Sequence, residues 1–292
     1  MPLHHYIEQY FQQHPESRSK GISIENSPLE KRPKIFKVED SNVKTAPQIP
    51  IRIYTPSEEK NYPLLIFFHG GDLLQGNLET HDVSCRLIST LSGYKVIAVD
   101  YQNTSAQFSD SYLVTKSIVE HAEEYKGKSI DIAIGGASIG ANLAAAIVLK
   151  SIKTGDFKLS KQILYYPITD INNQIKGSEY QSRELYNAKY GLDISNAENL
   201  SLYNENEETD YISPIKTSKK YLTKMPKTLV FTAEYDPLCD EGELYAQRLK
   251  EAGVEVRLVR FDGNIHGFMQ SFPGSPDYMR GYDITTEFLN SD

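Results

Sequence analysis

The sequence contains little cysteine and no long apolar run, and both deficits restrict the kind of protein it encodes. Among 292 residues only Cys85 and Cys239 carry thiols, too few for the disulfide framework of a small secreted domain. No apolar stretch approaches the roughly 20 residues that a membrane-spanning helix needs. The N-terminal stretch MPLHHYIEQYFQQH lacks a basic region followed by a continuous apolar segment, so we expect no secretory signal. These features predict a cytoplasmic protein.

The chain also has fewer basic than acidic residues. The chain has 31 lysines and arginines against 39 aspartates and glutamates, which gives a net charge of -8. Binding to nucleic acid or to an anionic membrane surface needs cationic faces, so neither is expected as the main partner. Hydrophobic residues form 39% and charged residues 24% of the chain, which is typical of a folded protein. The length fits one α/β domain with an additional subdomain.

The hydrophobic pattern predicts a mostly parallel β-sheet with helices on both faces. Continuous apolar runs are typical of strands covered on both sides, and they lie at 64–68, 96–99, 131–134, 162–166 and 228–232. Helical periodicity alternates with these runs, at 82–92, 112–125, 140–152, 241–252 and 278–289. Such alternation is typical of the α/β class, in which the working site forms beyond the carboxyl ends of the strands.

Three further segments complete the predicted sheet. Residues 34–40 and 49–54 alternate in period two, so they predict a pair of antiparallel strands before the parallel ones. Residues 254–261 form a longer and more charged segment. This composition predicts a strand nearer an edge of the sheet.

Two regions fall outside the alternation of strands and helices. Residues 171–225 are rich in tyrosines, asparagines and acids and contain no clear buried strand. Residues 1–20 predict an amphipathic helix, with one face formed by Tyr6, Ile7, Tyr10 and Phe11. We expect a single domain over 1–292, with a core at about 34–170 and 226–292 and a helical cap formed by about 1–33 and 171–225.

The segment 136–140, GASIG, matches the pattern G-x-S-x-G. It follows the apolar run 131–134 and opens an apolar helix, which is the context of a sharp strand-to-helix turn. Small neighbours leave room for a strained, exposed serine in such a turn. The helix N-terminus and the N–H of Ile139 would then face a developing oxyanion. Ser138 is therefore a candidate nucleophile, and the alternative is an ordinary glycine turn.

The segment 69–72, HGGD, directly follows the apolar run 64–68. A pair of glycines after a buried strand lets the backbone approach a substrate closely. The candidate oxyanion donors are therefore the N–H groups of Gly70, Gly71 and Asp72, together with that of Ile139. A plain turn at the end of a strand is the alternative.

A serine nucleophile needs a base, and the base needs an acid that orients it. His266 lies between glycines in the loop before the last predicted helix, at the carboxyl end of a strand. Asp236 follows another buried strand and is the candidate acid. Glu234 and Asp240 are rivals, although Asp240 is better placed to cap the helix after it. The chain order Ser138, Asp236, His266 is the order expected of α/β-hydrolases.

Other histidines have simpler explanations. His4, His5 and His14 lie in the N-terminal extension, and His121 lies on a helical face. His81 lies near the start of a helix, where capping or bonding to the loop explains it.

At these residues the chain resembles the hormone-sensitive lipase-like branch of the α/β-hydrolase esterases, over roughly residues 35–290. HGGDLLQGNLETHD is similar to the family's HGGG loop, and GASIGANLAAA is similar to its G-D-S-A-G nucleophile elbow. AEYDPLCDEGELYA and IHGF are similar to its acid and histidine loops. The resemblance implies the α/β-hydrolase fold, with Ser138 as nucleophile, Asp236 as orienting acid, His266 as base, and backbone donors at Gly71, Asp72 and Ile139.

Three positions depart from the family pattern. Ala137 replaces the aspartate of the elbow, and residues 100–105 read DYQNTS where the family has a Y-R-L-A-P-E stretch. These two changes alter packing around the site and leave the triad intact. Asp72 replaces the third glycine of HGGG. A carboxylate about 5 Å from a forming oxyanion would cost roughly 1 to 3 kcal/mol, so Asp72 bears on efficiency and substrate range more than on mechanism.

The sequence therefore predicts a carboxylic ester hydrolase. Its activity should rise as His266 loses its proton, near an unperturbed pKa of roughly 6.5. No metal or organic cofactor is needed, the expected partner is a small-molecule ester, and a homodimer is compatible with the sequence. The tyrosines of the predicted cap either line an acyl pocket or pack within the cap, and they are Tyr180, Tyr186, Tyr190 and Tyr203.

Two alternatives stay open at this point. One is a non-catalytic small-molecule binding protein on the same scaffold, for which Asp72 is the main argument. The other keeps the triad but acts on amides or thioesters or transfers the acyl group to another acceptor, because the nucleophile chemistry is shared.

Overall fold

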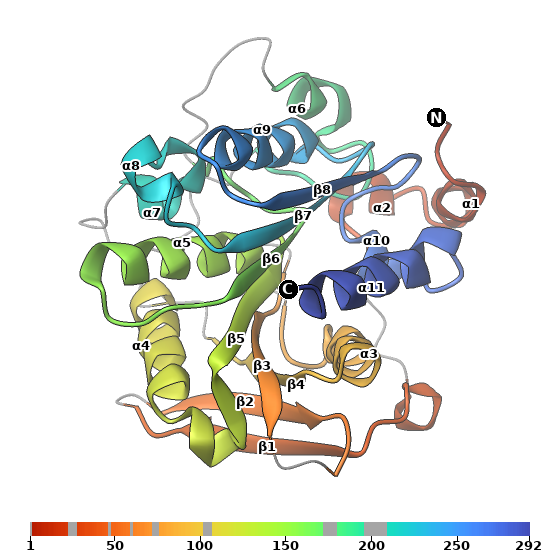
Figure 1. Cartoon of the computed structure of the whole chain (residues 1–292). Helices are drawn as coiled ribbons and strands as arrows, with labels where there is room; N and C mark the ends of the chain where they lie inside the picture. The colour runs from red at the N-terminus through yellow and green to blue at the C-terminus, as the bar shows by residue number, and fades with distance from the viewer. Residues whose placement is uncertain are drawn as a thin grey trace.

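The computed structural model describes residues 2–22, 28–45, 48–58, 61–71, 76–101, 107–171, 180–195 and 209–292. Its centre is one eight-stranded sheet with the strand order β1-β2-β4-β3-β5-β6-β7-β8 (Figure 1). The strands are β1 (Lys37–Val43), β2 (Ile49–Thr55), β3 (Tyr62–Phe68), β4 (Lys95–Val99), β5 (Gly127–Ala137), β6 (Lys161–Tyr165), β7 (Lys227–Ala233) and β8 (Val256–Phe261).

The strand directions confirm the predicted sheet. Strand β2 is antiparallel to both β1 and β4, whereas the pairings from β4 through β3 to β8 are parallel. Strand β8 lies at an edge, as its charged sequence predicted. Because β3, β5, β7 and β8 run in the same direction, the loops after them meet at one end of the sheet.

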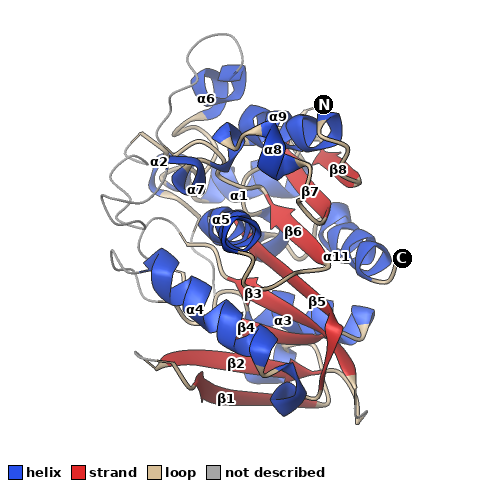
Figure 2. Ribbon diagram, turned by 60° about the vertical axis from the view of Figure 1, so that its left-hand side comes forward, coloured by secondary structure: helices blue, strands red, loops and turns tan. Residues whose placement is uncertain are grey.

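Helices cover both faces of the sheet, as Figure 2 also shows. One face is covered by α1 (His5–Gln13), α3 (Asp82–Ser92), α10 (Phe268–Ser271) and α11 (Pro276–Leu289), and the other by α4 (Gln107–Glu120), α5 (Ile139–Thr154) and α9 (Cys239–Glu251). Successive residues of β3 enter opposite cores: Leu64 and Ile66 pack on the α5 side, and Leu65 and Phe67 on the α3 side. This two-sided burial explains why the strand reads as a continuous apolar run.

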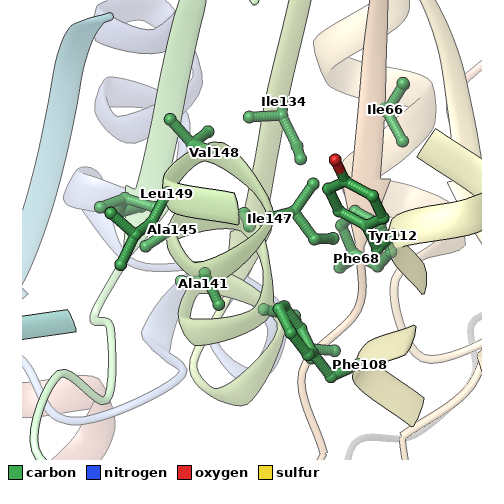
Figure 3. Packing of buried hydrophobic residues seen from close by; sticks show 14 of the residues in the cluster. Ile66, Phe68, Phe108, Tyr112, Ile134, Ala141, Ala145, Ile147, Val148 and Leu149 are labelled. Carbon is green, nitrogen blue, oxygen red and sulfur yellow. The ribbon is translucent and has the colours of Figure 1, made fainter. Parts of the chain in front are cut away.

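Helix α5 is buried along most of its length and fixes the turn that precedes it. Ile147 of α5 lies among Ile134 of β5, Phe68 of β3 and Phe108 of α4 (Figure 3). Burial of a side chain of this size contributes roughly 1.5 to 3 kcal/mol. The helix that begins directly after Ser138 is therefore held by the core rather than by the loop around it.

The N-terminal segment departs from the prediction. The sequence predicts one helix over 1–20, but α1 ends at Gln13 and a separate turn, α2, covers Ser17–Lys20. Pro15 explains the break, because a residue before proline is disfavoured in the helical conformation. Tyr6, predicted on the buried face, is half exposed.

Between β6 and β7 the described residues form short helices. They are α6 (Gln181–Tyr186), α7 (Thr209–Ile212), a 3-10 turn at Pro214–Lys216 and α8 (Lys219–Leu222). Helix α6 contacts α9, and α7 contacts α5. In the described part of the chain, no helix has the length and apolar character needed to cross a bilayer.

Candidate active site

Ser138 occupies a strained turn between β5 and α5. Its φ is 54° and its ψ is -117°, a region that residues with a Cβ seldom adopt. The turn is also crowded: a Cβ at Gly140 would overlap the carbonyl oxygen of Phe68, and one at Gly136 would overlap the carbonyl of Gly140. Close backbone approach therefore explains both glycines of G-x-S-x-G.

The structure brings together the three side chains that the sequence singled out. Nε2 of His266 lies 3.0 Å from Oγ of Ser138, and Nδ1 of His266 lies 2.7 Å from Oδ2 of Asp236. Ser138 follows β5, Asp236 follows β7 and His266 follows β8. Parallel strand direction therefore places groups 30 and 128 residues apart in sequence within hydrogen-bonding reach.

The hydrogen bonds of Asp236 determine which nitrogen of His266 carries the proton. Asp236 is fully buried, and its Oδ1 accepts a hydrogen bond of 2.8 Å from the N–H of Leu238. An ionised carboxylate can only accept, so Nδ1 of His266 carries the hydrogen. Nε2 then presents a lone pair to the hydroxyl of Ser138, which is the arrangement of a general base.

The two rival acids have other partners. Oε2 of Glu234 accepts a 2.7 Å bond from the N–H of Gly263, at the start of the histidine loop. The prediction that Asp240 caps the next helix is wrong: Leu238 is at the N-cap position, and Oδ2 of Asp240 accepts a 2.8 Å bond from the N–H of Ser182 in α6. Capping preferences consider only neighbouring residues, so they could not predict that Asp240 would accept a hydrogen bond from Ser182, 58 residues earlier in the chain.

The predicted oxyanion loop lies beside Ser138, with one correction. The N–H of Gly70 donates a 3.2 Å hydrogen bond to Nε2 of His81, so Gly70 is unsuited to the role of oxyanion donor. Gly71 lines the cavity that contains Ser138, and Ile139 is the first residue of α5, where an N–H has no acceptor within the helix. Asp72 lies outside the described residues.

The cavity next to the triad is small. Its volume is about 50 Å³, and its lining includes Ser138, His266, Gly71, Tyr166 and Gln270. A cavity of about 680 Å³ lies against β1 and β2, and none of these residues lines it. The hydrogen-bonded chain of acid, base and hydroxyl therefore makes the smaller cavity the candidate site.

Sequence reasoning missed Tyr166 and Gln270. Tyr166 directly follows β6 with a φ of 37°, and its ring packs edge-on against His266 at a centroid distance of 4.8 Å. Its hydroxyl donates to Oε1 of Gln270, and burial raises the pKa of Tyr166 well above its usual value. This neutral tyrosine supports one side of the imidazole. The position of Tyr166 at the carboxyl end of a buried strand was the sequence signal that could have identified it as a residue of the site.

Two buried histidines flank the loop after β3 and are neutral near pH 7. Burial lowers the pKa of His69 to about 4 and that of His81 to about 3. The ring of His69 stacks on Tyr101 at 4.1 Å, and the Tyr101 hydroxyl donates to the His69 carbonyl at 2.5 Å. These contacts fix the start of the loop.

These histidines predict a loss of stability in acid. An unfolded histidine has a pKa near 6.5, so below that pH the unfolded chain binds more protons than the folded one. Their contribution is fully present above about pH 6.5 and is lost as the pH falls toward about 4 for His69 and about 3 for His81. At pH 5 we expect each to lower the free energy of unfolding by about 2 kcal/mol relative to pH 8.

Urea denaturation at pH 5 and pH 8 measures this effect. His81→Gln, which cannot titrate, should reduce the difference between the two pH values by about 2 kcal/mol. His121→Gln, at an exposed position, should leave the difference unchanged. An equal pH dependence in the wild type and His81→Gln would show that His81 does not remain neutral in the folded state.

The described residues contain no group of three or more His, Cys, Asp or Glu side chains arranged to hold a metal ion. The two cysteines are buried free thiols.

Comparison with known proteins agrees with this fold. A family model described as alpha/beta hydrolase fold matches residues 65–270. An arylesterase of Saccharolobus solfataricus is 33% identical over 255 residues, which cover 84% of this chain and 79% of that protein. The carboxylic ester hydrolase LipN of Mycobacterium tuberculosis is 32% identical, over 78% of this chain and 62% of that protein.

A solved structure extends the likeness to the whole chain. The hyperthermophilic esterase from the archaeon Pyrobaculum calidifontis superposes with a TM-score of 0.85 at 29% identity, covering 99% of this chain and 98% of that one. The chain belongs to the alpha/beta hydrolase fold family. Its named relatives are esterases, which confirms the predicted resemblance to the hormone-sensitive lipase-like esterases and the expectation of an ester hydrolase.

Proposed function

We propose that the protein is a serine carboxylesterase that hydrolyses small to medium carboxylic acid esters through an acyl-enzyme. Ser138 attacks the ester carbonyl while Nε2 of His266 accepts its proton and then passes it to the leaving alcohol. Asp236 holds the imidazole and stabilises the imidazolium. Water, activated by His266, then releases the acid and regenerates the serine. The observation that carries this proposal is the hydrogen-bonded chain from Asp236 through His266 to Ser138.

The oxyanion of each tetrahedral intermediate needs donors placed before the reaction begins. We assign this role to the N–H groups of Gly71 and Ile139 and to that of position 72. The small cavity beside Ser138 supports a short acyl group as the part of the substrate held there. Amides and thioesters would use the same steps, and the esterase relatives favour the ester.

We also propose that about 1–33 and 171–225 form a cap over this site. Ile22 and Gly191, one from each segment, both line the cavity at Ser138. A Cβ at Gly191 would lie 2.9 Å from the side chain of Ile22, so the two segments meet at the cavity. Tyr186 and Tyr190 pack on Tyr235 of the core with ring centroids 5.3 and 5.1 Å apart, which favours packing of the cap against the core as their role. Tyr203 lies outside the described residues.

Titration with diethyl p-nitrophenyl phosphate tests the proposal. We expect release of one equivalent of p-nitrophenolate per chain and one diethylphosphoryl group on the peptide that contains Ser138. The same preparation should hydrolyse p-nitrophenyl acetate and butyrate. A non-catalytic binding protein would instead release no p-nitrophenolate from any of these three compounds. Labelling at another residue would reject the assignment of Ser138.

A further inference from the structure

His81 lies where the loop after β3 meets the first turn of α3. It is almost fully buried and lines the same cavity as Ser138. Its ring plays no part in the hydrogen-bonded chain that ends at Ser138. Nε2 of His81 instead receives the N–H of Gly70, one residue before the donor assigned to the oxyanion.

A hydrogen-bond relay determines the tautomer of His81. The hydroxyl of Thr80 donates to the carbonyl oxygen of Asn77 at 2.8 Å and accepts from the N–H of Asn77 at 3.2 Å. The hydroxyl proton of Thr80 is therefore already engaged with Asn77. Toward Nδ1 of His81, which lies 3.0 Å away, the Thr80 oxygen can only act as an acceptor. Nδ1 thus carries the hydrogen, and Nε2 presents its lone pair to Gly70.

This hydrogen bond is one of two side-chain contacts that hold the backbone at Gly70, whose carbonyl oxygen lies 3.1 Å from Nδ1 of His69. A glycine has wide conformational freedom, so the direction of the next N–H, that of Gly71, is set by what surrounds Gly70. A Cβ at Gly70 would lie 2.9 Å from the carbonyl oxygen of Ala137, and one at Gly76 would overlap the carbonyl of Gly70. Backbone atoms therefore surround Gly70 closely, and Nε2 of His81 accepts the hydrogen bond from its N–H.

We propose that His81, with its tautomer fixed by Thr80, is a positioning residue that turns the Gly71 N–H toward the oxyanion. The inference rests on the proposed function, because it assigns the Gly71 N–H to the oxyanion of that reaction. If the lone pair of Nε2 is lost, the N–H of Gly70 is left buried without an acceptor. The peptide then rotates to find another acceptor, and the Gly71 N–H moves with it.

Thr80→Val tests the relay without touching His81. Valine has nearly the shape of threonine but accepts no hydrogen bond, so the imidazole is free to adopt the tautomer in which Nε2 carries hydrogen. That hydrogen would face the Gly70 N–H. We expect kcat for p-nitrophenyl acetate to fall by about 10- to 100-fold, with KM changed by less than about threefold. Thr80→Ser keeps the hydroxyl and should restore most of the activity.

His81→Leu removes the acceptor itself and should lower kcat at least as much as Thr80→Val. Thr90→Val, on the exposed side of α3, is the matched control and should keep wild-type kcat and KM. The decisive second measurement is the Kd of a trifluoromethyl ketone, whose adduct with Ser138 carries an oxyanion. Its Kd should rise by about the same factor as kcat falls, because a transition-state analogue needs the same donors.

The outcomes separate the two proposals. If wild-type protein neither hydrolyses the ester nor reacts with the phosphate ester, the proposed function itself fails. If wild type is active but Thr80→Val and His81→Leu keep kcat within twofold, only the role of His81 is overturned. A fall in kcat with no change in the Kd of the ketone would also overturn it, and circular dichroism confirms that each variant is folded.

Discussion

Replacement of Ser138 by alanine is expected to lower kcat by on the order of 10⁴-fold or more. The hydroxyl is the group that would form the acyl-enzyme, and its Oγ lies 3.0 Å from Nε2 of His266. The oxyanion donors and the binding cavity would remain, so slow hydrolysis above the rate in water should persist. Hydrolysis of p-nitrophenyl acetate under saturating substrate measures the loss.

Ser218→Ala is the matched control for this experiment. Ser218 is an exposed serine just before α8 and makes no side-chain cap hydrogen bond, so its replacement should leave kcat and KM unchanged. The Ser138→Ala protein should also fail to release p-nitrophenolate from diethyl p-nitrophenyl phosphate. A Ser138→Ala enzyme that keeps a tenth or more of wild-type kcat would end the assignment of Ser138 as nucleophile.

Arg183→Met should lower the free energy of unfolding by about 3 to 5 kcal/mol. Arg183, in α6, donates to Oε2 of Glu241, which has almost no exposed surface. Oε1 of Glu241 accepts from the N–H groups of Thr169 at 2.6 Å and Asp170 at 3.2 Å. Burial raises the pKa of Glu241 to about 7 even with this cation in place. Without Arg183 the carboxylate would be buried and unpaired.

Urea denaturation at pH 8 measures this effect, and Arg257→Met is its control. The pair of Arg257 with Glu287 is exposed, with an N–O distance of 2.9 Å, so its loss should cost no more than about 1 kcal/mol. The double variant Arg183→Met/Glu241→Gln keeps an oxygen for the two backbone N–H groups and should regain part of the loss. If Arg183→Met costs no more than Arg257→Met, Glu241 must carry a proton in the folded protein.

This ion pair also bears on the organisation of the site. Ser182, next to Arg183, accepts a 3.2 Å bond from the N–H of Asp240 through its hydroxyl, and that hydroxyl donates to the carbonyl of Pro237 at 3.1 Å. Helix α6 is therefore attached to the loop that carries Asp236. A variant that loosens α6 is expected to disturb the acid as well as the proposed cap.

The strands and the three loops of the site were predictable because their signals are local. Burial on both faces turns β3 and β5 into continuous apolar runs, and the close approach of backbone to Gly136 and Gly140 leaves glycines on both sides of Ser138. Since loops after parallel strands meet at one end of the sheet, the positions of Ser138, Asp236 and His266 in the chain indicated that their side chains would meet.

Other features depend on contacts between segments that the sequence does not place side by side. Asp240 looked like a helix cap because capping is judged from neighbouring residues, but α6 lies beside it and supplies the N–H that it accepts. Gly70 looked like an oxyanion donor because it shares a loop with Gly71. Only the packing of α3 against that loop turns its N–H toward His81, since a hydrogen bond is decided by which groups fold into contact rather than by the residue types alone.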